Sequence, residues 1–318
     1  MEVIHLSYPL QDQLVAEIHP PTVTAIGNFD GVHKGHQAVI GAAKQLANEI
    51  NAVHAVMSFT PHPRSVLKKQ DDFTYLTPLP EKLTQFESLG VERAYIMKFD
   101  PSLAQLSKED FVRSVLIPLG FKGITVGFNF TFGIKASGKP SDLAQLGEGY
   151  YTTRVVNPVQ NNQYTFSSTQ LRLSLAEGKM DHASQILGRN YQIAGRVVQG
   201  DQRGRLMGFP TANIALQEPY LIPRYGVYIV KVHGPFKAGY CYGIMNIGLR
   251  PTFNDPIPRE QLEVHLFEFS GDLYGQELRV QFLHFLRAEL KFDSVHALKQ
   301  QIHSDQKEAM DWLLIHEN

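Results

Sequence analysis

The sequence predicts an α/β domain followed by a small antiparallel β-barrel, and three observations support this prediction. Strand and helix signals alternate along the first half of the chain, which is typical of a parallel, doubly wound sheet covered by helices. Short alternating apolar runs separated by glycine and proline fill residues 191–286, which is typical of a barrel. At roughly 150 residues per domain, a length of 318 residues favours two domains.

The first half alternates predicted strands and helices in the order that a parallel sheet requires. A helix is expected to begin near His33, because Val39, Ala43, Leu46, Ala47 and Ile50 repeat on one helical face. Ligands of doubly wound sheets bind at the carboxyl ends of the strands. The predicted strands cover residues 22–26, 52–59, 91–97, 124–127 and 153–156, and two further helices cover 81–89 and 107–119, the second with Ser107 and Asp110 near its start.

The second half predicts five or six strands and a closing helix. Two short helices are expected around residues 178–191, and we place the domain boundary between residues 184 and 185. The predicted strands cover residues 192–198, 226–232, 239–247, 262–269 and 277–286. The C-terminal helix is expected to bury one face, formed by Val295, Leu298, Ile302, Ala309 and Leu313.

The composition excludes several classes of protein. Thirty basic and 31 acidic residues give a net charge of −1, which argues against binding to nucleic acid or acidic lipid by bulk charge. The single cysteine, Cys241, forms no intramolecular disulfide and no multi-cysteine zinc site. We see neither a signal peptide nor an apolar run of about 18 residues, the length that a membrane span needs. We therefore expect a cytoplasmic protein without membrane partners.

A glycine-bearing turn and two histidines follow the first strong strand, at residues 27–36. His33 and His36 are three residues apart at a helix start, so both lie on one face. The free N–H groups and the positive dipole end there favour an anion, and Gly35 leaves room for it. The pattern suits a triphosphate whose bridging oxygen becomes negative as pyrophosphate leaves. Packing at the helix start is the plain alternative; a metal pair is another, but no third ligand lies at useful spacing.

Three further segments combine rigid turns with polar or aromatic residues. Pro61 and Pro63 stiffen a turn that presents His62 and Arg64, although a rigid loop with a solvated arginine is an equal reading. Ser168 or Thr169 is expected to cap a helix, and the same helix start could hold a phosphate that Arg172 reaches. Aromatic residues alternate at positions 128, 130 and 132. This spacing fits side chains of a strand that pack in the core, and it also fits side chains that lie beside a planar ring of a ligand.

The second half contains a glycine-rich loop that is not a P-loop, because no Gly-Lys-Ser/Thr follows its glycines. Backbone amides near Gly200, Gly204 and Gly208 could fold over phosphates. Thr211 and Asn213 bring oxygen ligands of the kind that Mg²⁺ prefers. Taken alone, the segment also fits an ordinary hairpin, and Glu263 fits a solvated strand carboxylate.

The histidine segment resembles the nucleotidylyltransferase superfamily, and more narrowly the adenylyltransferase half of bacterial bifunctional riboflavin kinase/FAD synthetases. Residues 59–64, 126–133 and 167–172 resemble later motifs of that half. The resemblance implies a Rossmann-like domain over 1–184 in which His33 and His36 are catalytic. It implies ATP contacts at Gly27, Asn28, Phe29, Asp30, Gly35, Ser168, Thr169 and Arg172, and flavin contacts at His62, Pro63, Arg64, Asn129 and Phe130. Many relatives carry Asp at the place of Asn129 and Arg at that of Ala136.

Residues 210–213, Pro-Thr-Ala-Asn, are identical to a motif of the riboflavin kinase module, and residues 246–253, 262–266, 272–275 and 287–292 resemble the same module. The resemblance implies a six-stranded barrel over 185–318 with Glu263 as catalytic base. It places ATP phosphates at Gly200, Gly204, Gly208, Pro210, Thr211 and Asn213, Mg²⁺ at Thr211 and Asn213, and the flavin at Arg287 and Phe292.

The two resemblances together predict a bifunctional enzyme. Riboflavin would be phosphorylated to FMN with Mg-ATP, and FMN would then be adenylylated to FAD with release of pyrophosphate. A chain with kinase activity alone, or a flavin-sensing protein without turnover, are the alternatives. The expected partners are riboflavin, FMN and ATP, with no nucleic acid, and the chain is expected to be a monomer or a weak homo-oligomer.

Overall fold

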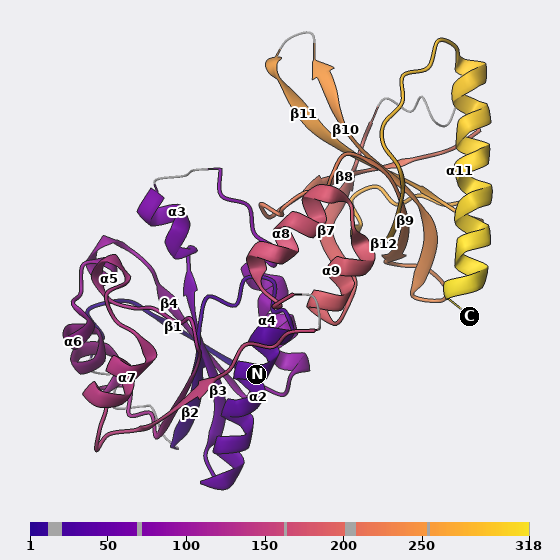
Figure 1. The fold of residues 1–318 in the computed structure, drawn as a ribbon. Helices are drawn as coiled ribbons and strands as arrows, with labels where there is room; N and C mark the ends of the chain where they lie inside the picture. Colours follow the sequence, from indigo (N-terminus) through magenta and orange to yellow (C-terminus); the bar gives the residue numbers. More distant parts are fainter. Residues whose placement is uncertain (12–20, 69–71, 162–163, 201–207, 253–254, 318) are drawn as a thin grey trace. The chain divides into compact units, whose positions relative to one another are not determined.

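The computed structural model describes residues 1–11, 21–68, 72–161, 164–200, 208–252 and 255–317 (Figure 1). The chain forms two compact units, Met1–Gln170 and Leu171–Asn318, which we call unit 1 and unit 2. The predicted boundary at 184/185 stays a prediction. Within the described ranges, the helices include none that is both long enough and apolar enough to cross a bilayer.

Unit 1 is built on a six-stranded sheet in which every neighbouring pair is parallel. The strand order is β1-β4-β3-β2-β5-β6, so the chain builds outward from β2 first to one side and then to the other. This is the doubly wound arrangement that the alternating pattern predicted. The strands are β1 (Glu2–Leu6), β2 (Thr22–Ile26), β3 (Val53–Thr60), β4 (Arg93–Lys98), β5 (Gly123–Gly127) and β6 (Thr152–Val156).

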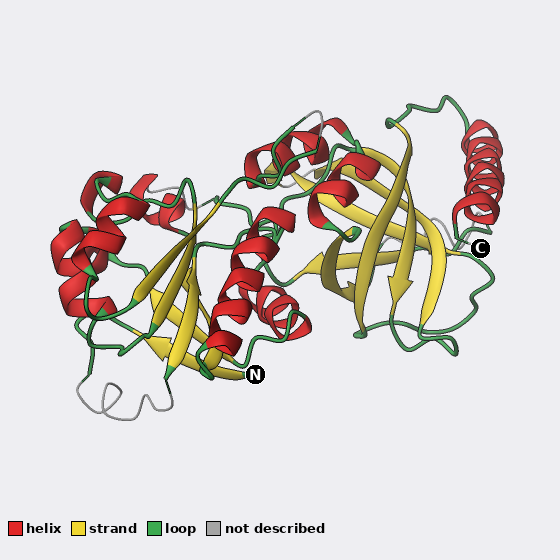
Figure 2. Ribbon diagram, turned by 60° about the horizontal axis from the view of Figure 1, so that its bottom comes forward, coloured by secondary structure: helices red, strands yellow, loops and turns green. Residues whose placement is uncertain are grey.

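Helices cover both faces of this sheet (Figures 1 and 2). Successive strand residues point to opposite faces, so Ala55 and Met57 pack on one side and Val56 on the other. One face is covered by α2 (Lys34–Glu49) and α4 (Leu79–Ser88). The other is covered by α5 (Pro101–Ala104), α6 (Lys108–Phe111) and α7 (Pro140–Leu146), while α3 (Pro63–Lys68) follows β3.

Unit 1 departs from the predicted elements in three places. The helix predicted over 107–119 begins as expected, with Ser107 Oγ accepting the Asp110 N–H at 3.0 Å, but continues as a π-helical turn, Val112–Leu116. The edge strand β1 was not predicted. Ile50, expected on the buried face of α2, lies just beyond the helix end and is exposed.

Unit 2 is a closed barrel of six antiparallel strands, as predicted, in the order β10-β11-β8-β7-β12-β9 (Figure 2). Closure removes the exposed edges that an open sheet would leave. β8 was not predicted, because its residues were read as part of the glycine-rich loop. The strands are β7 (Tyr191–Val198), β8 (Ala212–Leu216), β9 (Gly226–His233), β10 (Tyr240–Thr252), β11 (Asp255–Leu266) and β12 (Glu277–Arg287).

Three helices accompany the barrel. The two short helices α8 (Ser168–Glu177) and α9 (Met180–Leu187) precede it, and α11 (Val295–His316) follows it. Ile302, Ala309 and Leu313 of α11 pack on the barrel as predicted, whereas Val295 is 61% exposed. Trp312 of the same helix stacks on the rings of His284 and His316.

Candidate active sites

The first site lies where β2, β3 and β5 end, at the same edge of the unit 1 sheet. β2 has β3 on one side and β5 on the other, so the direction of chain winding reverses beside it. Doubly wound sheets bind ligands at such a reversal, beyond the carboxyl ends of the strands. The predicted segments that follow β2 and β5 therefore share this edge.

The loop after β2 is fastened by hydrogen bonds to neighbouring elements. Gly27 N donates to Met57 O at 3.1 Å. The carbonyl oxygen of Asn28 accepts from Ser58 Oγ at 3.2 Å and from Lys82 Nζ at 2.8 Å. Phe29 then adopts a positive φ of 50°, a conformation that is uncommon for a residue with a side chain. Strained backbone of this kind clusters at functional sites.

The two histidines meet at the start of α2, as predicted. His33 is the N-cap, and its Nδ1 accepts the His36 N–H at 3.3 Å. The two rings stack with centroids 3.6 Å apart, and the edge of the Phe29 ring meets His36 at 5.4 Å. Gly35 lies against the His33 ring, where a methyl group would stand 3.0 Å from His33 Cε1. The helix start is thus packed tightly around one imidazole pair.

His36 is electrostatically unusual. Its Nδ1 is buried and has no hydrogen-bond partner among the described residues. Burial, the neighbouring His33 and the charge of Lys82 together hold the pKa of His36 well below its ordinary value. His36 is therefore a neutral imidazole near pH 7.

Asp30 is held through both its side chain and its backbone, and its predicted ATP contact stays a prediction. Its Oδ1 accepts the backbone N–H of Leu76 at 2.9 Å and of Thr77 at 3.2 Å. Its carbonyl oxygen accepts from Ser168 Oγ at 2.8 Å. These contacts fasten the loop after β2 to two segments that are distant in the sequence.

The start of α8 corrects one detail of the prediction. The cap is Ser167, whose Oγ accepts the Gln170 N–H at 3.2 Å, and neither Ser168 nor Thr169. The Ser168 hydroxyl instead reaches the carbonyl of Asp30 in the histidine loop. Ser168 thus stands beside the first site, while Thr169 and Arg172 follow in the first two turns of α8.

The turn after β3 is a helix start. α3 begins at Pro63, and His62 Nδ1 accepts the Arg64 N–H at 3.1 Å. The His62 ring is buried and stacks on Phe73 at 4.6 Å, while its backbone N–H donates to Tyr75 Oη at 3.2 Å. Phe73 and Tyr75 form an aromatic wall that the sequence reasoning missed. Arg64 is exposed.

The segment after β5 is open to solvent. Phe128 is 49% exposed, and Asn129 beside it is exposed as well. Phe130 is partly buried and stacks on the buried ring of Phe132 at 5.9 Å. The expectation of core packing therefore holds for Phe132 and fails for Phe128. Ala136 adopts a positive φ of 56°.

Lys82 was missed altogether. Its side chain is 3% exposed, and it lies in the first turn of α4. Lys82 stands four residues before Phe86, so the two share the buried face of the helix. A lysine inside an apolar helical stripe is the sequence signal that could have identified it.

The second site lies on one face of the unit 2 barrel. Asn213 of β8 is directly opposite Glu263 of β11 in the strand register. Gln261 Nε2 donates to Glu263 Oε1 at 2.6 Å and to Asn213 Oδ1 at 3.3 Å. Gly200 stands against the Asn213 side chain, where the structure leaves no space for a Cβ. The predicted base and a predicted magnesium ligand are therefore neighbours in one hydrogen-bonded network.

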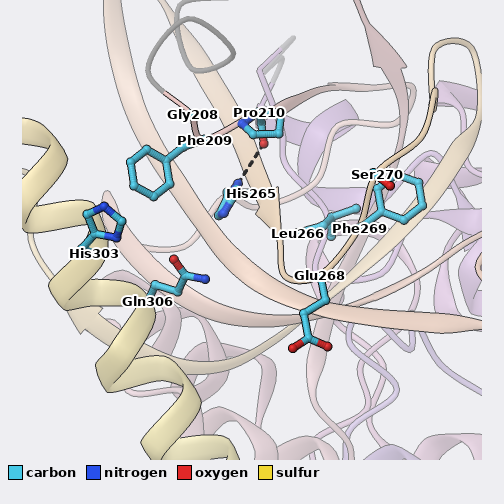
Figure 3. Close-up of a pocket in the computed structure, with 10 residues that line it drawn as sticks. All are labelled: Gly208, Phe209, Pro210, His265, Leu266, Glu268, Phe269, Ser270, His303 and Gln306. Atoms are coloured by element: carbon cyan, nitrogen blue, oxygen red, sulfur yellow. Dashed lines mark hydrogen bonds between the residues drawn. The ribbon is translucent and has the colours of Figure 1, made fainter.

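Unit 2 also has a cavity of about 570 Å³, lined by residues of the segment before β8, of β11 and the residues after it, and of α11 (Figure 3). His265, two residues beyond Glu263 on the same strand, lines it, and the His265 Nδ1 is 2.9 Å from the Pro210 carbonyl oxygen. Phe209 meets the rings of His265 and His303 edge to face. Gly208 and Pro210 also line this cavity, whereas Gly204 lies outside the described residues.

Arg287 forms an internal ion pair. Its Nε and one terminal nitrogen donate to the two carboxylate oxygens of Asp305 at 2.8 and 2.7 Å. Asp305 is 2% exposed and also accepts from Gln301 Nε2 at 2.8 Å. This bidentate pair ties the end of β12 to α11. Phe292 follows in the segment between them and is partly exposed.

The residues predicted to hold a metal fit a hard cation in their chemistry. Thr211 offers a hydroxyl oxygen, and Asn213 offers an amide oxygen opposite Glu263 in the strand register. Oxygen ligands are those that Mg²⁺ prefers. Across the part of the chain that the structure describes, no group of three or more His, Cys, Asp or Glu residues could hold a metal ion.

Comparison with protein families gives two matches that follow each other along the chain. A family described as FAD synthetase matches residues 15–170, and one described as riboflavin kinase matches residues 187–313. The two matched regions contain the first and the second site, respectively.

Individual relatives match almost the whole chain. A bifunctional riboflavin kinase/FMN adenylyltransferase of Bacillus subtilis is 38% identical over 98% of both chains. The protein of the same name from Listeria monocytogenes is 38% identical over 97% of both chains. A crystal structure named as a macrolide-efflux protein from Streptococcus pneumoniae matches with a TM-score of 0.86 and 29% identity, over 97% of this chain and 99% of that one.

Proposed function

The chain belongs to the bifunctional riboflavin kinase/FMN adenylyltransferase family, and on this premise we propose that unit 1 carries the adenylyltransferase site and unit 2 the kinase site. The chain is an enzyme with both activities. The assignment of one activity to each unit is supported by the order of the two family matches along the chain. Each matched region contains one of the two described sites. A kinase without the second activity is not favoured, since the FAD synthetase match spans the histidine site.

In unit 1, a phosphate oxygen of FMN attacks the α-phosphorus of ATP, and the bond to the β-phosphate oxygen breaks as pyrophosphate leaves. The developing negative charge lies at the start of α2, where His33 and His36 stack and free N–H groups meet an anion. The neutral imidazole of His36 stabilises that charge by donating a hydrogen bond. Ser168, Thr169 and Arg172 hold the departing phosphates, and the segments around Arg64, Asn129 and Phe130 receive the flavin.

In unit 2, the 5′-hydroxyl of riboflavin attacks the γ-phosphorus of ATP, and ADP leaves. An alcohol is a weak nucleophile near neutral pH, so a carboxylate must orient it and accept its proton. Glu263 is that base, and the hydrogen bond from Gln261 Nε2 at 2.6 Å fixes its orientation. The backbone from Gly208 to Thr211 receives the phosphates beside it.

Mg²⁺ would be held by Thr211, Asn213 and the phosphate oxygens of ATP. When bound, it spreads the negative charge of the triphosphate during phosphoryl transfer. The Asn213 amide is already turned toward Gln261 and the Glu263 strand, so the protein contributes two neutral oxygens and one nearby carboxylate. We further propose a cytoplasmic enzyme that is a monomer or a weak homo-oligomer.

Two single substitutions test the division of the sites. Glu263→Gln removes the base while keeping the size of the side chain, so riboflavin phosphorylation should fall by about 100-fold or more. FAD formation from supplied FMN should stay unchanged. His36→Ala should have the opposite pattern, because it removes the hydrogen bond to the departing phosphate. Both products are measured by chromatography from incubations with riboflavin or with FMN.

Each variant is the control for the other, because each should keep one activity. Circular dichroism checks that both proteins are folded. Loss of both activities in a folded Glu263→Gln protein would contradict the separation of the sites. Retention of FAD synthesis by His36→Ala would contradict the histidine site.

A further inference from the structure

Lys82 is a buried cation beside the histidine site of unit 1. We propose that Lys82 is a positioning residue for adenylyl transfer, whose ammonium fixes the loop after β2 and supplies the positive charge that a bound triphosphate meets there. The inference rests on the proposed function of the histidine site. It adds to that site a residue outside the His-x-Gly-His segment.

The contacts of α4 support this role. Lys82 Nζ donates to the carbonyl oxygen of Asn28 at 2.8 Å. One turn further along the same face, the Phe86 ring meets the ring of Phe29 at 5.6 Å. Successive turns of α4 therefore hold two successive residues of the loop. An ammonium has three N–H donors, and the Asn28 carbonyl uses one of them.

Three features of the surroundings of Lys82 are unfavourable for the folding free energy. A lysine is rarely buried, and this side chain is 3% exposed. The first turn of a helix is the positive end of its dipole, which disfavours a cation. The described hydrogen bond goes to a neutral carbonyl, which offsets the burial of a charge less than a carboxylate would. Proteins break such local rules mainly at functional sites.

The site needs a positive charge, and the neutral His36 does not provide it. His36 is neutral near pH 7, and Lys82 is one of the groups whose charge keeps it so. The titratable groups that interact electrostatically with Lys82 are Asp30 of the loop and His36 of α2. Asp30 is already engaged through Oδ1 with the Leu76 and Thr77 N–H groups. The Lys82 ammonium is therefore a buried cation that can balance a triphosphate.

The titration of Lys82 gives this role a measurable signature. Burial lowers the pKa of Lys82 to about 8, and the charge of Asp30 partly opposes the change. The ammonium is mostly charged at pH 7 and mostly neutral at pH 9. If its charge is needed, kcat/KM for FAD formation falls as the pH rises through about 8, because that profile reports the free enzyme.

The experiment compares Lys82→Met and Lys82→Arg with the native chain between pH 6.5 and 10. Lys82→Met should lower kcat/KM for FAD formation from FMN by about 100-fold at pH 7, mainly through kcat. Lys82→Arg should restore most of the activity and remove the decline above pH 8, because a guanidinium stays charged there. Riboflavin phosphorylation by the same proteins should be unchanged, which controls for folding and ATP quality.

Lys122→Met is the matched control, because it removes an exposed lysine that directly precedes β5. Lys122 lies at the amino end of this strand, whereas the histidine site lies at the carboxyl ends of the strands. It should leave both activities unchanged. Native kcat/KM in folded Lys82→Met would overturn the proposal. So would an alkaline decline in Lys82→Arg at the same pH as in the native chain. If Lys82→Met does not fold, the pH profile of Lys82→Arg decides alone.

His36→Ala, measured beside these variants, separates two kinds of failure. If His36→Ala keeps FAD synthesis, the histidine site itself is wrongly assigned. If His36→Ala loses FAD synthesis while Lys82→Met keeps it, the site stands and the role of Lys82 is wrong.

Discussion

Buried polar side chains around the loop after β2 each have a physical reason to be there. His33 caps α2, Asp30 fastens the loop to the backbone at residues 76 and 77, and Lys82 holds the carbonyl of Asn28. The first two make hydrogen bonds that an apolar residue could not replace. Lys82 differs, because the carbonyl it binds has a second donor in Ser58. Replacing Lys82 by an apolar residue should therefore raise the unfolding free energy of unit 1 while it lowers the rate of FAD synthesis.

Lys82→Met should raise the stability of unit 1 at pH 7. A pKa lowered from 10.5 to about 8 corresponds to a penalty of up to about 3.5 kcal/mol, at about 1.4 kcal/mol per unit. Between pH 8 and 10.5 the unfolded chain binds this proton and the folded chain does not, so the penalty is complete below pH 8 and fades as the pH rises. The stabilisation should consequently shrink between pH 7 and 10.

Thermal unfolding followed by circular dichroism at pH 7 and pH 10 measures this difference. Lys122→Met is again the control, with little expected change at either pH. A lower midpoint for Lys82→Met at pH 7 would mean that the ammonium contributes more to the fold than its burial costs.

At the scale of elements, hydrophobic periodicity predicted the strands and helices that have a repeating apolar pattern. It missed the elements whose conformation depends on tertiary contacts. Thr22–Ile26 and the start of α2 are as predicted, because a β-branched run and an apolar stripe fix them locally. The helix over 107–119 was expected to be regular, and no pattern in its residues distinguishes a π-helical turn. β8 was missed, because Ala212 and Asn213 are poor strand formers that pair only when β7 and β11 flank them.

The sites were predictable to a similar extent. His33, His36, Asn213 and Glu263 lie in short motifs, and the structure brings each pair together. The partners that orient them come from elsewhere in the chain. Gln261 is a strand residue without a motif, and Lys82 looks like an ordinary helix lysine until its burial is known. Their roles depend on tertiary contacts, which a single sequence does not contain.

The attachment of α11 to the barrel gives a prediction at this scale. Asp305→Ala leaves the Arg287 guanidinium and Gln301 without their carboxylate, so unfolding free energy should fall by about 2–3 kcal/mol. The segment carrying Phe292 joins these elements, so FMN formation should fall as well, while FAD formation from FMN should not. Urea unfolding and product analysis measure the two effects.

Glu49→Ala provides the comparison, because it removes an ion pair with Arg154 in which both side chains are exposed. An exposed pair contributes little, about 0.5 kcal/mol or less. Equal effects of the two substitutions would show that the Arg287–Asp305 pair does not hold α11 in place.

At the scale of the whole molecule, the position of α8 and α9 decides where the chain can be divided. Within unit 2, Arg224 N donates to Leu175 O at 2.9 Å, and Ile186 and Leu187 of α9 are fully buried or nearly so. Both helices thus belong to the packing of the barrel. A division at 184/185 would cut through α9 and expose this apolar surface.

We therefore expect a fragment of residues 168–318 to fold and to phosphorylate riboflavin. A fragment of residues 185–318 should be less stable or aggregate, because it lacks the helices that cover the barrel. Expression yield, thermal unfolding and FMN formation compare the two. Equal stability of both fragments would support the boundary at 184/185 that the sequence predicted.

The aromatic stack on α11 makes one half of the molecule optically distinct. The sequence has a single tryptophan, Trp312, and it lies in unit 2 between His284 and His316. Intrinsic indole fluorescence therefore reports on the kinase half alone, whereas far-ultraviolet dichroism averages over both halves. Two coincident unfolding curves would reveal halves that melt together, and two separated curves would give each half its own melting point without any added label.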